Sequence, residues 1–303
     1  MLLAYNLSKM LKTMPLATRK NLPGAIELSG PRMLNLARTC VMGVLNVTPD
    51  SFSDGGEYDN AARAVSRALE MERQGADIID IGGESSRPGA DPVPADQELK
   101  RVIPVIEGVR KESQIPLSID TYKASVAEAA LDAGADIIND ISALRFDSGM
   151  IDVVRERKVP VILMHMLGTP TTMQVEPHYD DCVREISSFF DERMEICDKH
   201  GIDSSRIILD PGIGFGKRVS DNIEILARLG EFTRHGLPLL VGTSRKSFIG
   251  RLHHGDTPAG KRLGGSIASM LAAIINGADI VRVHDVAESV EAIRIISAIR
   301  EGV

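Results

Sequence analysis

Short apolar runs alternate with longer amphipathic stretches along most of the chain. The residues of each run are nearly all apolar, which is typical of parallel strands buried on both faces. The predicted strands are Val41–Leu45, Ile78–Ile81, Pro116–Ile119, Ile137–Ile138, Pro160–Met164, Arg206–Leu209, Leu237–Val241 and Ile280–Val283. The helical patterns that separate and follow them are Ala61–Arg73, Ala95–Lys111, Lys123–Ala133, Gly149–Arg157, Tyr179–Lys199, Asp221–Leu229, Ala259–Ile275 and Ala287–Arg300.

A helix–turn–strand unit occurs three times with similar letters. It reads QGADIIDIGGES at Gln74–Ser85, AGADIINDIS at Ala133–Ser142 and NGADIVRVHD at Asn276–Asp285. Eight strand–helix units within roughly 260 residues predict an α/β fold, a (β/α)8 TIM barrel. A doubly wound open sheet is the alternative, but it usually carries a Gly-rich dinucleotide fingerprint after its first strand, which this chain lacks.

The first residues differ from the rest of the chain. Within the first forty, the only acid is Glu27, and the basic residues are Lys9, Lys12, Arg19, Lys20, Arg32 and Arg38. We therefore expect residues 1–38 to be an N-terminal extension, partly disordered or packed at the barrel base, and residues 39–303 to form the barrel. An organelle transit peptide or an upstream start codon would also account for such a segment.

Composition limits the classes of function. The formal net charge of −7 and the isoelectric point near 5.6 argue against a nucleic-acid-binding face. Cys40, Cys182 and Cys197 have no zinc-site spacing, which suits a reduced cytoplasmic compartment without disulfides. No apolar run approaches the roughly 18 residues that would span a membrane, so we expect no membrane contact.

Polar residues follow every predicted strand. In a (β/α)8 barrel these positions meet at one rim, where active sites lie. We therefore expect one functional rim built from Asn46, Gly82–Arg87, Asp120, Asn139–Asp140, His165, Asp210, Thr243–Ser247, Arg282 and His284.

The residue types at this rim indicate two adjoining pockets. Asp120, Asn139 and Asp210 offer acceptors and one amide donor, which match the edge of a flat heterocycle carrying N–H donors and a carbonyl. The cationic or potentially cationic groups are Arg87, Lys246, Arg282 and His284, which suit a phosphate or diphosphate. The alternative is that these cations pair with the acids of the rim.

Two loops have unusual composition. The first strand runs into a Pro/Gly/Asp-rich segment, Thr48–Gly56, which we interpret as a mobile lid over the site. The second, Leu209–Lys217, reads LDPGIGFGK and is not a phosphate-binding Walker loop. Its glycines would let the backbone and Phe215 approach a flat ring, and we expect Lys217 to be solvated.

Seven segments hold most of these residues: MGVLNVTPDSFSDGG, GGESSRPGA, SIDTYK, INDIS, LDPGIGFGK, GTSRKSFIG and VRVHDV. In order and spacing they closely resemble the dihydropteroate synthase family, over about residues 40–303. The resemblance implies a homodimeric transferase of folate biosynthesis, the target of sulfonamides. Its members join 6-hydroxymethyl-7,8-dihydropterin diphosphate to 4-aminobenzoate and release diphosphate.

The resemblance also implies roles for individual residues. The positions that match pterin-ring contacts are Asp120, Asn139, Met164, Asp210, Phe215 and Lys246. Those that match the diphosphate site are Ser86, Arg282 and His284, with Asn46 as the Mg²⁺ ligand. The aminobenzoate positions are Phe52, Arg87, Pro88 and Ser247. We expect Lys246, Asp120, Asp210 and Arg282 to carry the catalysis.

Two other functions stay open at this point. A methyltetrahydrofolate corrinoid methyltransferase would share the Asp and Asn contacts but would not need the cations of a diphosphate site. A non-catalytic pterin-binding paralogue would be credible if Asn46, Lys246 or His284 were missing, and all three are present.

Overall fold

Eight parallel strands form a barrel in the computed structural model, which describes residues 24–48, 57–85, 89–252 and 257–301. The strands follow one another around the sheet in the order β8-β7-β6-β5-β4-β3-β10-β9, and a parallel bridge from Leu209 to Leu239 closes the circle. They are β3 (Cys40–Asn46), β4 (Ile78–Gly82), β5 (Leu117–Asp120), β6 (Ile137–Asp140), β7 (Val161–Met164), β8 (Ile207–Asp210), β9 (Leu240–Val241) and β10 (Ile280–Val283). The predicted (β/α)8 barrel is confirmed, with each predicted strand in place.

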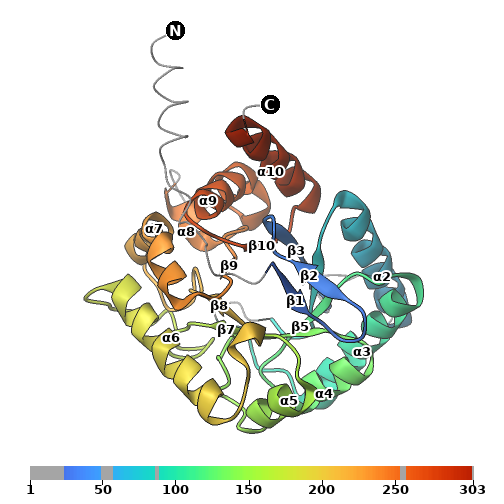
Figure 1. Cartoon of the computed structure of the whole chain (residues 1–303). Helices are drawn as coiled ribbons and strands as arrows, with labels where there is room; N and C mark the ends of the chain where they lie inside the picture. Colours follow the sequence, from blue (N-terminus) through green and yellow to red (C-terminus); the bar gives the residue numbers. More distant parts are fainter. Residues whose placement is uncertain (1–23, 49–56, 86–88, 253–256, 302–303) are drawn as a thin grey trace.

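Helices surround the barrel on its outside (Figure 1). The long ones are α2 (Glu57–Gln74), α3 (Ala95–Glu112), α4 (Ala124–Asp132), α5 (Gly149–Arg157), α6 (Cys182–Lys199), α7 (Val219–Ala227), α9 (Leu263–Ile275) and α10 (Val286–Glu301). Three short helical elements were not predicted: α8 (Ser247–Leu252) and the 3₁₀ helices η2 (Ser204–Arg206) and η3 (Leu229–His235). A further 3₁₀ helix, η4 (Ala259–Lys261), lies at the start of the predicted helix Ala259–Ile275. Among the described residues, no helix is long and apolar enough to cross a membrane.

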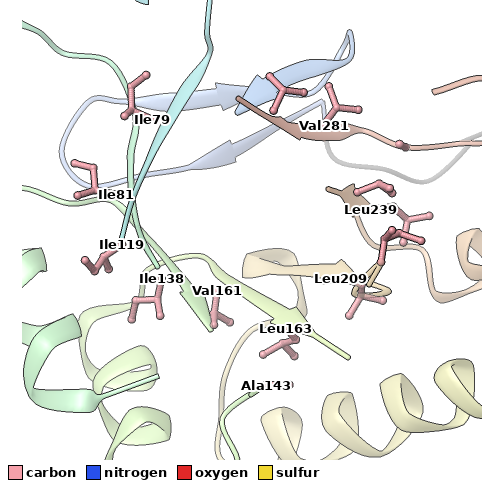
Figure 2. Close-up of a cluster of buried hydrophobic side chains, with 14 of the residues drawn as sticks. Ile79, Ile81, Ile119, Ile138, Ala143, Val161, Leu163, Leu209, Leu239 and Val281 are labelled. Carbon is pink, nitrogen blue, oxygen red and sulfur yellow. The ribbon is translucent and has the colours of Figure 1, made fainter. Parts of the chain in front are cut away.

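Successive side chains along each strand point alternately out of and into the barrel, and so form two separate apolar clusters. Outward-facing residues pack against the helices in the main core, and Figure 2 labels several of them, among them Ile79, Ile138 and Leu209. Inward-facing residues near the strand starts form a second cluster that fills the lower half of the barrel. This cluster includes Met42, Ile78, Ile137, Ile162, Ile208, Leu240 and Ile280.

A two-stranded hairpin closes the base of the barrel. Its strands β1 (Ala25–Glu27) and β2 (Met33–Asn35) pair antiparallel, and Ile26 and Leu34 belong to the inward-facing cluster. An ion pair of 2.7 Å from Arg32 to the buried Asp136 ties the hairpin to the strand starts. In Figure 1 this blue hairpin lies across the barrel opening. Residues 24–38 therefore lie against the barrel base, and residues 1–23 are outside the described part of the chain.

Candidate active site at the carboxyl ends of the strands

Polar side chains replace the apolar ones at the next inward-facing level of the barrel. Because inward positions recur every second residue, the polar group lies two residues beyond the apolar one, as Asn139 does beyond Ile137 and Arg282 beyond Ile280. Each strand ends at or close to that residue, so the groups gather at one end of the barrel. The inward-facing residues at this level are Asp80, Asp120, Asn139, Met164, Asp210 and Arg282.

A cavity opens above this level and takes residues from six of the strands or the loops after them. Its wall combines acids, an amide, two cations and an apolar side made of sulfur, aliphatic and aromatic groups. The lining residues are Asp120, Asn139, Ile141, Met164, Asp210, Gly212, Ile213, Phe215, Gly242, Lys246 and Arg282. All six residues that the family resemblance assigned to a heterocycle thus line one cavity, together with Arg282.

An ion-pair network crosses the floor of the cavity. Arg282 Nε donates to Asp80 Oδ2 at 2.6 Å, and its terminal nitrogen donates to Asp120 Oδ2 at 2.7 Å. Asn139 Nδ2 donates to the same Asp80 oxygen at 3.1 Å. Asp80 is completely buried and lies inside β4, so the polar residues at the strand ends do not include it. Its signal was an acid inside an apolar strand, IIDIG, at an inward-facing position.

Burial controls the protonation of the groups around this floor. It raises the pKa of the Asp120 carboxyl to about 7, against the opposing charge of Arg282. It raises the pKa of Asp210 to about 6, although the Gly212 N–H donates to that carboxylate at 2.7 Å. Burial and the nearby Arg282 together lower the pKa of Lys246 to about 8. The cavity therefore holds groups that exchange protons near neutral pH, as is common at catalytic sites.

The loop after β8 supplies the aromatic side of the cavity. Lys246 Nζ lies 4.0 Å from the centroid of the Phe215 ring, a cation–π contact. Three glycines in this loop have positive φ angles, and a Cβ on Gly212 would lie 2.0 Å from the carbonyl oxygen of His165. Glycine is therefore required at this position, where the loop passes directly over the end of β7.

Lys217 ends the same loop, and the expectation that it is solvated is wrong. The side chain is only 3% exposed, and its Nζ contacts His165 Nδ1 at 2.9 Å. It also donates to the carbonyl oxygens of Phe215 and His165, at 3.0 and 3.3 Å. Burial lowers its pKa to about 7. Lys217 thus fastens the glycine-rich loop to the end of β7 and holds the backbone of Phe215.

Two residues assigned to the rim from the sequence face away from the cavity. His165 is buried, with its ring 4.9 Å from that of Phe189 on α6. Asp140 accepts hydrogen bonds from the backbone N–H groups of Ser142 and Leu144, at 2.7 and 2.9 Å. The expectation that every strand end contributes to one rim is therefore wrong here, because adjacent strand residues point to opposite faces.

The turn after β9 and the end of β10 form a cationic edge beside the cavity. Arg245 has a positive φ of 59°, and its guanidinium makes a two-point ion pair with Asp285. Ser244 Oγ contacts both the backbone nitrogen and Nδ1 of His284, at 3.1 and 3.0 Å. These contacts bring together the segments around residues 245 and 284, which were predicted to share a site.

The remaining predicted residues lie at the outer rim or beyond the described chain. Asn46 is half-buried at the end of β3, and Ser247 is exposed at the start of α8. The predicted lid beyond Thr48 is also outside the described residues. So are four assigned side chains, namely Phe52, Ser86, Arg87 and Pro88.

A second polar network supports the loop that leads to residues 86–88, and sequence reasoning missed it. Lys123 pairs with Glu84 and, at 2.5 Å, with the fully buried Glu98 of α3. The Tyr122 hydroxyl donates to Glu84 at 2.6 Å. This network joins the loops after β4 and β5. No pattern in the sequence pairs Glu84 with a residue almost forty positions away.

Comparison with known proteins agrees with this geometry. The family model described as "Pterin binding enzyme" matches residues 42–284 of the chain. A dihydropteroate synthase of Escherichia coli (strain K12) is 48% identical over 265 residues, which are 88% of this chain and 93% of that protein.

Solved structures show the same similarity. A Xanthomonas albilineans dihydropteroate synthase with 4-aminobenzoic acid superposes with a TM-score of 0.86 at 46% identity, covering 91% of this chain and 98% of that one. A Burkholderia cenocepacia dihydropteroate synthase complexed with 7,8-dihydropteroate gives a TM-score of 0.83 at 45% identity, covering 93% and 98%.

Proposed function

Because this chain belongs to the dihydropteroate synthase family of pterin-binding enzymes, we propose roles for its residues in the reaction of that family. The enzyme condenses (7,8-dihydropterin-6-yl)methyl diphosphate with 4-aminobenzoate to give 7,8-dihydropteroate and diphosphate. One observation supports the assignment most directly. The carboxylates and the amide of β5, β6 and β8 converge in the cavity that Lys246 and Arg282 also line.

The pterin ring is bound at the polar floor of this cavity. Asp120 and Asp210 accept hydrogen bonds from the amino and ring N–H groups, and Asn139 both donates and accepts. Met164 and Phe215 pack against the ring, since they belong to the apolar side of the cavity wall. Lys246, seated over Phe215, donates to the pterin carbonyl region.

The diphosphate lies beside the ring, toward the cationic edge. Arg282 reaches from the floor, where its charge is held by Asp80 and Asp120, and its planar guanidinium suits phosphate oxygens. His284 follows two residues later on the same side of β10, so it faces the same rim. Ser86 contributes a hydroxyl to this subsite by its match to the family.

We propose that Asn46 is a ligand of Mg²⁺. Its side chain offers a neutral oxygen at the end of β3, and the described residues contain no cluster of acidic, His or Cys side chains that could hold a metal by themselves. Such a site fits Mg²⁺, which usually takes most of its ligands from phosphates and water. When bound, the ion supplies positive charge to the leaving diphosphate.

The 4-aminobenzoate lies above the pterin, at the rim. Ser247 at the exposed start of α8 contacts its carboxylate. Phe52, Arg87 and Pro88, which lie outside the described residues, are assigned to the same subsite by their match to the family. These four residues come from three separate loops, so this subsite is completed by loops rather than by strand ends.

The chemistry proceeds without a covalent enzyme intermediate. The bond between the pterin methylene carbon and the diphosphate oxygen breaks, and the aniline nitrogen forms a bond to that carbon and then loses a proton. Asp120 and Asp210 stabilise positive charge that develops on the pterin, while Arg282 and His284 stabilise the departing anion. Lys246 borders both pockets and is the residue on which turnover depends most.

We also propose that the enzyme is a cytoplasmic homodimer. Free, buried cysteines support a reducing compartment. Exposed apolar side chains on neighbouring helices support an interface on this side of the barrel. They are Leu252 on α8, Leu263 on α9, and Ile295 and Ile299 on α10.

Release of diphosphate from the pterin diphosphate tests the function, measured with and without 4-aminobenzoate and Mg²⁺. We expect release to require both additions and to be matched by formation of 7,8-dihydropteroate. Release that ignores 4-aminobenzoate, or none at all, would argue for one of the two alternatives, the methyltransferase or the non-catalytic protein.

A further inference from the structure

The hydroxyl of Ser244 and the imidazole of His284 form a pair with two contacts. Ser244 Oγ lies 3.1 Å from the backbone nitrogen of His284 and 3.0 Å from its Nδ1. The pair is held by neighbouring strands, because Ser244 follows β9, which pairs with β10 just before His284. Ser244 is buried, so both contacts are shielded from water.

The backbone N–H of His284 donates to Ser244 Oγ, and this fixes the direction of the hydrogen bond between Ser244 Oγ and His284 Nδ1. A backbone N–H can only donate, so it uses one lone pair of the Ser244 oxygen and leaves the hydroxyl proton to be placed. Among the described residues, His284 Nδ1 is the acceptor within reach of that proton. If Nδ1 carried a proton of its own, the hydroxyl proton of a buried serine would be left without a partner, which is unfavourable.

We infer that Ser244 holds His284 as the neutral imidazole with its proton on Nε2. His284 then meets the diphosphate as a hydrogen-bond donor of fixed orientation and not as a cation. This makes Ser244 a positioning residue, because it acts on the substrate only through His284. The role in substrate binding rests on the proposed function, whereas the tautomer is a property of the free enzyme.

The charges around the ring act in the same direction. Arg282 on β10 and Arg245 and Lys246 after β9 all disfavour an imidazolium, and Asp285 is the opposing acid. Asp285 is already paired with Arg245, which reduces its effect on the ring. Burial and these cations lower the pKa of His284 to about 3. The positive charge of the anion subsite therefore comes from the arginine and lysine side chains, and His284 works unchanged across the neutral pH range.

Nitrogen NMR of the whole enzyme, labelled with ¹⁵N-histidine, tests this inference directly. The chain has seven histidines, and the His284 signals are identified by their loss in His284→Gln. We expect an unprotonated Nδ1 and a protonated Nε2 at every pH between about 5.5 and 9. A proton on Nδ1, or titration of His284 with a pKa above about 6, would overturn the inference.

Variants of Ser244 test the positioning role. We expect Ser244→Ala to populate both tautomers and to raise the KM for the pterin diphosphate by about tenfold, the effect of one lost hydrogen bond. The KM for 4-aminobenzoate should stay within about twofold, and Ser244→Thr, which keeps the hydroxyl, should restore both the tautomer and the KM. An alanine variant with the wild-type tautomer would refute the role of Ser244. If the wild type and Ser244→Thr both hold His284 with its proton on Nε2 but neither forms 7,8-dihydropteroate, the tautomer inference stands and the proposed function of this site is contradicted.

Discussion

Replacing Arg282 by methionine should destabilise the folded enzyme as well as abolish its activity. The guanidinium lies between two acids, 2.6 Å from Asp80 and 2.7 Å from Asp120, and Asp80 is completely buried. Methionine keeps much of the apolar volume but leaves both carboxylates without a cation. Breaking a buried ion pair by removing one partner typically lowers the free energy of unfolding by about 3–5 kcal/mol, which we take as the expected loss at pH 8.

The loss should grow with pH. Burial raises the pKa of Asp120 to about 7, above its value in the unfolded chain. In the wild type, the free energy of unfolding is therefore unaffected by Asp120 at low pH and falls as the pH rises to about 7. Arg282 opposes that shift, so in Arg282→Met the pKa of Asp120 lies above 7 and stability continues to fall. Above pH 7 the difference between the two proteins should widen by up to about 1.4 kcal/mol per pH unit.

Urea unfolding at pH 7, 8 and 9 measures this difference. Far-UV circular dichroism is the suitable signal, because the chain has no tryptophan. Arg228→Met is the matched control, since Arg228 pairs with acids on the surface and exposed pairs contribute under about 1 kcal/mol. A loss below about 1 kcal/mol at pH 8 in Arg282→Met, or a difference that narrows from pH 7 to pH 9, would refute the reasoning.

Three further predictions concern this cavity and its rim. Lys246→Ala should lower kcat at least about 100-fold in the diphosphate-release assay, and near-normal turnover would contradict its role. Its free energy of unfolding should stay within about 1 kcal/mol of the wild type, because burial already disfavours the ammonium. Gly212→Ala should destabilise the protein by several kcal/mol in urea unfolding, because the new Cβ would clash with the His165 carbonyl. Gly236→Ala, with a similar positive φ but open space around it, should lose only about 1–2 kcal/mol, and equal losses would show that the clash is relieved. EDTA should abolish turnover but leave the midpoint of thermal unfolding of the free enzyme unchanged, because Asn46 alone cannot hold Mg²⁺ tightly. A lowered midpoint would indicate a metal that stays bound to the free enzyme.

The barrel could be predicted from the sequence because its signals are local. Each strand is a compact apolar run, and each helix before a repeated Gly-Ala-Asp turn is long enough to show its period. The short elements lack such signals: α8 has six residues, and β1 and β2 have three each. The expected helix Ala259–Ile275 is interrupted at Arg262, where η4 ends and α9 begins.

The errors at the site have one physical origin. Strand ends are not a ring of equivalent positions, because successive side chains alternate between the cavity and the helices. This alternation turns His165 and Asp140 outward and brings the interior Asp80 under the cavity. The burial of Lys217 depends on the path of a loop in space, since its partners lie just after β7 and on its own loop. The sequence pattern contains no information about that path.

The hairpin at the base has a consequence for the order in which the proposed substrates would bind. Because β1 and β2 cover the opening at the strand starts and apolar side chains fill the lower barrel, the described residues close the cavity at the base and leave its access at the rim. If the pterin binds at the polar floor as proposed, it lies deeper than an aminobenzoate bound at the rim. We therefore predict ordered binding, with the pterin diphosphate first and the aminobenzoate second. An aminobenzoate that bound first would block the passage to the floor, so high concentrations of it should inhibit the enzyme.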